Sequence, residues 1–220
     1  ARMGYLEPWH AMHGEKEVLS PVSDEARRRG EKVMAKAKQR TNTQVLEKMA
    51  DLVDDQHRIV EQRPFIVRET HTEHGQPVVE ALDDFLQSYL ESLSWDRRNL
   101  LERYRIVDVA RKVVGVGSVG TRCWVILLQG VDDGDPLFLQ VKQAQTSVLE
   151  AHAPAIAPFD NEGHRVVAGQ RMIQGSPDIF LGWGELGGVQ FYVRQLRDMK
   201  GGTEFREGRT DLTTLPDYCH

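Results

Sequence analysis

The first hundred residues carry apolar positions at three- and four-residue spacing, which is typical of helices with one buried face. Helices are predicted, in chain order, over Ser23 to Thr41, Gln44 to Leu52, Val78 to Leu93 and Asp96 to Tyr104. The first is basic and expected to be a solvated helix, whereas the third is strongly amphipathic. Two short β-prone pieces, around Ile59 and Phe65, interrupt them. This part of the chain is therefore predicted to be mainly helical.

From Arg105 onward the pattern changes to short apolar runs rich in β-branched and aromatic residues, which favour strands. Strands are predicted over Ile106 to Val114, Cys123 to Leu128, Leu137 to Val141, Asp178 to Trp183 and Val189 to Leu196. A helix is predicted between the third and fourth strands, over Asn161 to Gln174. Turn-forming residues between Leu128 and Leu137 indicate a hairpin there.

The expected fold class is α+β, with a small antiparallel sheet and one packed helix preceded by a helical connector. Three regions follow from this pattern: a mainly helical connector over residues 1–104, a strand-rich lobe over residues 105–201 and a tail over residues 202–220. The chain has 220 residues, which is enough for two small domains.

Charge and composition narrow the class of protein. The formal net charge of −5 argues against nucleic-acid binding, which needs clustered basic residues. No apolar run is long enough to cross a membrane, so no membrane partner is expected. The two cysteines, Cys123 and Cys219, offer neither a disulfide framework nor a metal-ligand spacing, which favours a reducing cytoplasm.

A glycine pattern is the main candidate for chemistry. Gly115, Gly117 and Gly120 match G-x-G-x-x-G, which alone is weak evidence. In a dinucleotide fold such glycines open a helix, but here an apolar, β-branched run follows. The pattern then fits a loop between two antiparallel strands, as in kinases, whose backbone N–H groups near Ser118 and Val119 could hold ATP phosphates. The alternative is a tight turn whose glycines only allow positive φ.

Lys142 supports the kinase-like interpretation, because it ends the third predicted strand of the lobe. A lysine at this place can reach the α and β phosphates of ATP as a compact charge. Gln195 and Leu196 follow the fifth strand and would offer backbone groups to adenine. A glutamate is expected to orient Lys142, with Glu150 and Glu162 as candidates, although an exposed glutamate is the default for both.

Other residue types that could carry chemistry have simpler explanations. The histidine pairs His10 with His13 and His71 with His74 lack support from cysteines or paired carboxylates, so scattered surface histidines are expected rather than a metal site. Trp124 is expected in the core of the lobe, and so is Trp183.

Five segments of the lobe resemble one family of proteins. They are Val109 to Arg122, Phe138 to Lys142, Arg165 to Arg171, Asp178 to Trp183 and Phe191 to Gly201. Together they resemble the bacterial domain-of-unknown-function family numbered 2252, which is classed with protein-kinase-like and aminoglycoside-phosphotransferase-like folds. The resemblance is close over the second half of the chain and loose over the first.

The resemblance implies a protein-kinase-like N-lobe for residues 105–201. It also implies a Gly-Asp-x-His-x-x-Asn catalytic loop and an Asp-rich metal-binding segment upstream of the glycines, neither of which occurs here. The chain is therefore expected to be an internal fragment, with no catalytic residue and no magnesium ligand of its own.

Three functions remain open on this basis. The first is the ATP-binding lobe of a phosphotransferase of unknown acceptor, active only with the missing catalytic lobe of the same polypeptide. The second is a non-catalytic regulatory or interaction module with a kinase-like fold. The third, a nicotinamide-binding domain, is disfavoured by the strand predicted after Gly120.

Overall fold

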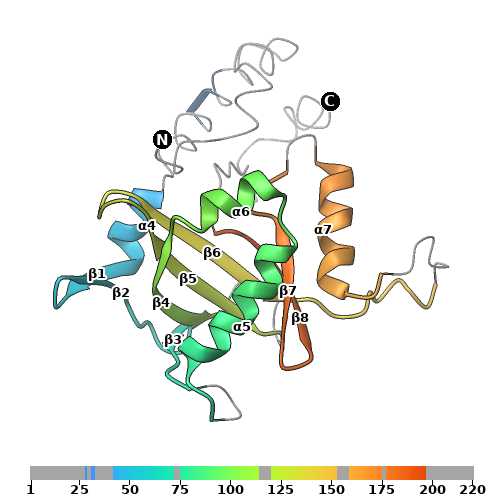
Figure 1. Cartoon of the computed structure of the whole chain (residues 1–220), viewed down its shortest axis with the longest axis horizontal. Coiled ribbons are helices and arrows are strands. Elements are labelled where there is room, and N and C mark those ends of the chain that lie inside the picture. The colour runs from blue at the N-terminus through green and yellow to red at the C-terminus, as the bar shows by residue number, and fades with distance from the viewer. Residues whose placement is uncertain are drawn as a thin grey trace, which may run out of the picture.

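Six antiparallel strands form the main sheet of the protein. The structure is a computed structural model, which describes residues 28, 31–32, 42–71, 75–113, 120–152, 159–174 and 177–196. In spatial order the strands are β3 (Ile66–Arg68), β4 (Arg105–Lys112), β5 (Cys123–Gln129), β6 (Pro136–Gln143), β8 (Val189–Gln195) and β7 (Gly182–Leu186). Every neighbouring pair in this sheet is antiparallel (Figure 1). The predicted α+β class is confirmed.

The sheet is larger than predicted because a strand from the first part of the chain joins its edge. β3 pairs with β4, placing Ile66 opposite Lys112. A buried carboxylate supports this edge: Asp108 accepts a hydrogen bond from the backbone N–H of Ile59 at 2.8 Å and pairs with Arg68 Nε at 3.2 Å. The predicted β-prone piece around Phe65 overlaps β3. What the sequence did not predict is that this piece joins the main sheet, because tertiary contacts place it there and local periodicity does not reveal them.

A separate two-stranded hairpin, β1 (Ala50–Val53) and β2 (Gln56–Ile59), follows helix α4 (Asn42–Met49). The helix predicted to run to Leu52 therefore ends earlier. Asp54 and Asp55 form the turn with φ values of 50° and 56°. Consecutive positive φ values give the primed turn whose twist suits a two-residue hairpin, and aspartate tolerates this region better than most residues.

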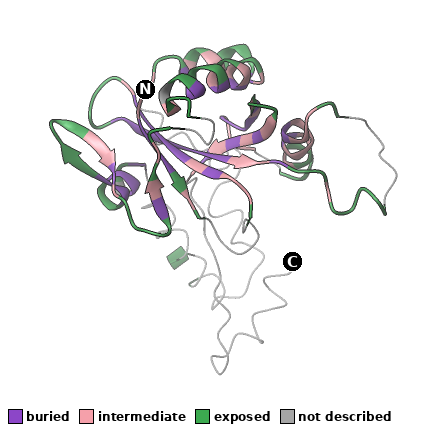
Figure 2. Cartoon of the chain, turned by 90° about the horizontal axis from the view of Figure 1, so that it is seen from below, coloured by how far each residue is buried: buried purple, intermediate pink, exposed green. Residues whose placement is uncertain are grey.

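Both faces of the sheet are covered. Since side chains alternate along a strand, β5 sends Ile126 and Leu128 to one face and Val125 and Leu127 to the other. Helices α5 (Val78–Glu91) and α6 (Trp95–Leu101) cover the first, which we call the α5 face. Helix α4 covers the second, which we call the α4 face. Figure 2 shows the central strands largely buried beneath helices with exposed outer sides.

The predicted boundary near residue 104 lies in the short turn between α6 and β4. Leu82 and Leu101, from the predicted connector, belong to the same buried cluster as Ile126 and Leu139, from the predicted lobe. Helices α5 and α6 therefore complete the core of the sheet that follows them in the chain. Among the described helices none is long and apolar enough to cross a membrane.

Helix α7 (Glu162–Ile173) lies between the third and fourth strands of the predicted lobe, as the periodicity predicts. Asn161 caps it, since the Asn161 side chain accepts a hydrogen bond from the backbone N–H of His164 at 3.1 Å. Val167 is fully buried, and the ring of His164 stacks on Trp183 with centroids 4.0 Å apart. Helix α7 therefore packs against the β7–β8 end of the sheet (Figure 1).

The predicted strand Asp178 to Trp183 begins too early. Asp178 instead forms a turn, in which its carboxylate accepts a hydrogen bond from the N–H of Phe180 and its carbonyl accepts one from Leu181. β7 begins only at Gly182 and joins β8 through Gly187 and Gly188. Both glycines have positive φ, which suits a tight hairpin. The other predicted strands of the lobe match the structure to within about two residues.

Close approach between α5 and β7 depends on small residues. A Cβ atom added at Gly182 would lie 2.5 Å from Ser92 Oγ and 2.8 Å from Tyr89 Cε2. The hydroxyl of Tyr89, which is fully buried, donates to the carbonyl of Phe180 at 2.7 Å. Ser92 Oγ also accepts a hydrogen bond from the N–H of Trp183. A side chain larger than glycine at position 182 would therefore disturb several buried contacts together.

We expect Gly182→Ala to lower the free energy of unfolding by about 1–3 kcal/mol, as overpacking does in tight cores. The matched control is Gly169→Ala, at an exposed position of α7 where nothing lies within 4 Å of the added Cβ. That control should stabilise by about 0.5–1 kcal/mol, because alanine favours helix more than glycine does. Urea unfolding of both variants measures the difference, and equal effects would contradict the packing argument.

Candidate functional site

The predicted phosphate-binding loop lies in the connection between β4 and β5. Gly115, Gly117, Ser118 and Val119 fall outside the described residues, whereas Gly120 is described and has a φ of 82°. β5 begins at Cys123, so a strand follows the glycine pattern and pairs antiparallel with β4. The helix that a dinucleotide fold places after its glycines does not occur here.

Lys142 lies close to the end of this connection. In the register of β5 and β6, Lys142 is the partner of Cys123, the first residue of β5, and on its other side it faces Tyr192 of β8. Alternation places the half-buried side chain of Lys142 on the α4 face. The structure thus brings Lys142 across from the strand that leaves the glycine segment.

The surroundings of Lys142 are cationic. Burial lowers the pKa of Lys142, and the nearby guanidinium of Arg194 lowers it further, since both disfavour another positive charge. The Nε atom of Arg194 is buried and has no hydrogen-bond partner. Lys112 adds a third cation, close enough to act on Cys123 together with Lys142 and Arg194. These side chains could stabilise an anion placed among them.

Cys123 lies near all three cations, and its buried environment makes the thiol a poor nucleophile. Burial raises the pKa of the Cys123 thiol to about 11, although the neighbouring cations act in the opposite direction. Only 2% of the residue is exposed. Since the thiolate is the nucleophilic form, Cys123 is expected to behave as an apolar core residue.

Gln195 and Leu196, the predicted adenine contacts, already use their backbone N–H groups. The N–H of Gln195 donates to Asp178 Oδ2, and the N–H of Leu196 donates to the carbonyl of Phe138 at 2.9 Å. Burial raises the pKa of Asp178, while its hydrogen bonds from Phe180 and Gln195 oppose the increase. An adenine ring that contacts either of these N–H groups would therefore have to replace the hydrogen bond that the group already makes.

The two glutamates considered as partners of Lys142 lie elsewhere. Glu162 pairs with Arg165 Nε within α7 at 2.5 Å, and Glu150 is exposed in the turn after β6. No ion pair joins a carboxylate to Lys142 within the part of the chain that the structure describes. Histidines 10, 13 and 74 fall outside the described residues.

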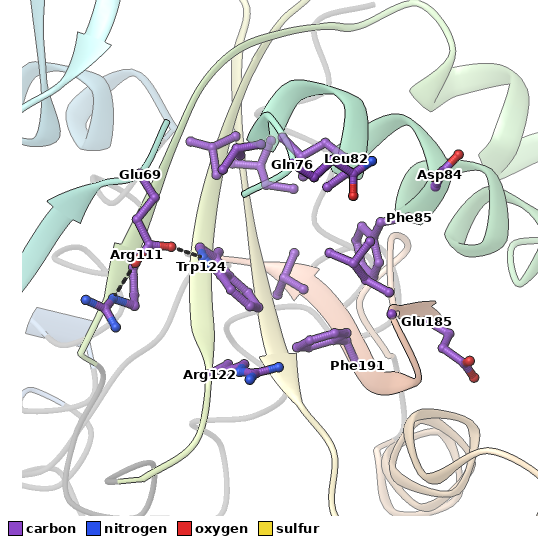
Figure 3. A pocket seen from close by; sticks show the side chains of 17 residues that line it. Glu69, Gln76, Leu82, Asp84, Phe85, Arg111, Arg122, Trp124, Glu185 and Phe191 are labelled. Atoms are coloured by element: carbon purple, nitrogen blue, oxygen red, sulfur yellow. Dashed lines mark hydrogen bonds and ion pairs between the residues drawn. The ribbon is translucent and has the colours of Figure 1, made fainter. Parts of the chain in front are cut away.

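A cavity of about 320 Å³ lies on the opposite face, between α5 and the sheet (Figure 3). Val141 lines it, whereas the next residue, Lys142, does not. At one side Glu69 accepts a hydrogen bond from Trp124 Nε1 at 3.2 Å and forms an ion pair with Arg111 Nε at 2.9 Å. The sequence prediction placed Trp124 in the core, but its ring is only half-buried and forms a wall of this cavity.

Reasoning from the sequence missed this cavity. The alternation of β4 and β5 could have shown that Arg111 and Trp124 share a face, since they are register partners. The contribution of Glu69 was not visible, because it comes from the segment after β3, about 40 residues before Arg111 in the chain.

A comparison with models of protein families matches the whole chain, residues 1–220, to one family, described as an uncharacterized protein conserved in bacteria (DUF2252). No curated protein matches the chain. No solved structure matches it.

We expect Cys123 to resist thiol reagents at pH 8 in the folded protein and to react once urea unfolds it. The experiment uses a Cys219→Ser background, so that Cys123 is the only thiol. The reason is the combination of burial with a pKa of about 11. Rapid labelling of the folded protein, at the rate of the unfolded chain, would contradict the described environment.

Proposed function

Because the chain belongs to the bacterial DUF2252 family over its full extent, we propose that it provides the ATP-binding lobe of a phosphotransferase with a kinase-like fold. In this proposal the glycine segment and Lys142 hold the phosphates, and a catalytic lobe elsewhere in the polypeptide supplies the base and the magnesium ligands. The observation that carries the proposal is the pairing of Lys142 with Cys123, which brings the lysine next to the end of the glycine segment.

The arrangement of elements supports this proposal. β4, β5, β6, β7 and β8 are antiparallel, and α7 lies between the third and the fourth of them in the chain. In kinases the glycine-rich loop covers the phosphates, the lysine lies on the third strand and the following helix carries its glutamate partner. Lys142 occupies the third of these strands, after a hairpin of the predicted kind.

The electrostatics of the α4 face also support an anionic ligand. Lys142, Arg194 and Lys112 all act on the Cys123 thiol, so each lies near it, and Arg194 also acts on Lys142. Like charges at short range are unfavourable, and a phosphate between them would relieve this cost. Arg194 is the register partner of Gln140, two residues before Lys142 on the same face. We therefore include Arg194 among the residues that contact the phosphates.

The second candidate is a module that keeps the fold without transferring phosphate. One observation favours it: Glu162 is held by Arg165 rather than by Lys142. Active kinases need a glutamate from this helix to pair with the lysine. The two functions differ in whether bound nucleotide turns over once the catalytic lobe is present.

Mutation of Lys142 tests nucleotide binding directly. We expect Lys142→Ala to weaken Mg-ATP binding by about 10- to 100-fold, since a charge-assisted contact contributes about 1.5–3 kcal/mol. Isothermal titration calorimetry on the chain measures the affinity. The matched control is Lys48→Ala, an exposed lysine on α4 that should leave the affinity unchanged. Equal affinities for wild type and Lys142→Ala would count against the proposal.

The affinity should also depend on pH. Lys142 binds phosphate as an ammonium, and its pKa is lowered from the ordinary lysine value of 10.5. Affinity for Mg-ATP is therefore expected to decrease as the pH rises and Lys142 loses its proton. Because the pKa of Lys142 is lowered, this decrease should begin at a lower pH than it would for a lysine with the ordinary pKa of 10.5. Lys142→Arg, which stays charged across this range, should abolish the fall. A decline that persists unchanged in Lys142→Arg would assign it to another group.

A further inference from the structure

We propose that the cavity on the α5 face is a second binding site, for a small aromatic molecule that carries a cationic amine. The cavity lies between α5 and the sheet and has a volume of about 320 Å³. Small-molecule sites have volumes of about 300–1,000 Å³, apolar walls and a few polar groups. This site is independent of the nucleotide proposal, because it lies on the other side of the sheet.

The walls of the cavity are apolar and rigid. They come from buried side chains of α5 and of four strands: Ala81, Leu82, Phe85, Val109, Ile126, Val141 and Phe191. Each of these residues is at most 8% exposed. Side chains that are fixed by a packed core keep the cavity open without a rearrangement, which lowers the cost of binding.

Three aromatic rings line the cavity and favour a flat ligand. Trp124 meets Phe191 edge to face, with ring centroids 5.4 Å apart, and Phe191 meets Phe85 at 5.8 Å and 90°. Trp124 is held in place because its Nε1–H donates to Glu69. A further ring could add to this edge-to-face arrangement, which contributes beyond the burial of area.

The rim of the cavity carries charges of both signs, including the cation Arg122, and the placement of these charges bears on the charge of the ligand. At one side, Glu69 is already bound by Arg111 and Trp124. At the opposite side lie Asp84, from α5, and Glu185, from β7 (Figure 3). Both are exposed, and within the described residues no salt bridge joins either of them to a cation. This acidic side favours an ammonium group on the ligand.

The geometry separates this site from the nucleotide site. Val141 faces the cavity, and the adjacent Lys142 faces the other side of the sheet. A ligand among Trp124, Phe85 and Phe191 is therefore separated from the cations near Lys142 by the sheet itself. Binding of Mg-ATP and of the aromatic amine should be measurable one without the other.

Three compounds with the same ring and different charges test the proposal: tryptamine, indole and indole-3-acetate. Calorimetry on the full chain should give the tightest binding for tryptamine and the weakest for indole-3-acetate. Asp84→Asn combined with Glu185→Gln should reduce the preference for tryptamine over indole by about two- to fivefold, which is typical of exposed charges. The matched control is Asp83→Asn, the neighbouring exposed residue that does not line the cavity.

A second variant fills the cavity. Ala81→Leu extends a side chain from α5 into the space and should abolish binding of tryptamine, while Mg-ATP affinity stays as in wild type. Ala168→Leu on α7 is the control, because Ala168 does not line the cavity. Circular dichroism confirms that each variant is folded. Absence of binding for all three compounds, or undiminished tryptamine binding to folded Ala81→Leu, would overturn the proposal. Loss of Mg-ATP binding alone would leave it standing and would overturn only the proposed function.

Discussion

The two central strands of the sheet are apolar on both faces, and the rest of the structure depends on this constraint. β5 is buried along almost its whole length, and β6 is buried from Pro136 to Val141. A sheet with two apolar faces is unstable in water unless both faces are covered. The chain meets this need by placing α5 and α6 on one side and α4 on the other. Helices α4, α5 and α6, which precede residue 105, are therefore part of the core.

This division of the sheet separates two kinds of chemistry. On the α4 face the alternation of β6 and β8 places Lys142 and Arg194 among polar and half-buried groups. On the α5 face the same strands present Val141 and Phe191 to an apolar cavity. One residue along a strand thus separates a cationic environment from an aromatic one. The proposed nucleotide and the proposed amine would be bound on opposite sides of a single sheet.

The strength of the local sequence pattern decided how well each element could be predicted. The helix around Val167 and the strands β5, β6 and β8 have strong periodicity or long apolar runs, and the predictions for them match the structure closely. β2 was indicated only as a β-prone piece around Ile59, and β1 was missed because its residues were predicted to end a helix. The side chains of this hairpin are mostly exposed, and its stability depends on contacts with α4 and β4. β7 begins late because Asp178 uses its carboxylate to build a turn, which a search for apolar runs cannot detect.

The sequence alone determined the α+β class, the strand–strand–strand–helix–strand–strand order of the second half and the position of Lys142 on the third strand, because these follow from local periodicity and turn chemistry. Only the tertiary structure decided which face each side chain occupies and which distant segments meet there. Glu69 and Arg111 form one polar group with Trp124, although Glu69 and Trp124 are 55 positions apart in the chain. Such contacts depend on the packing of α5 over the sheet and on strand register, and neither is encoded in a short stretch of chain.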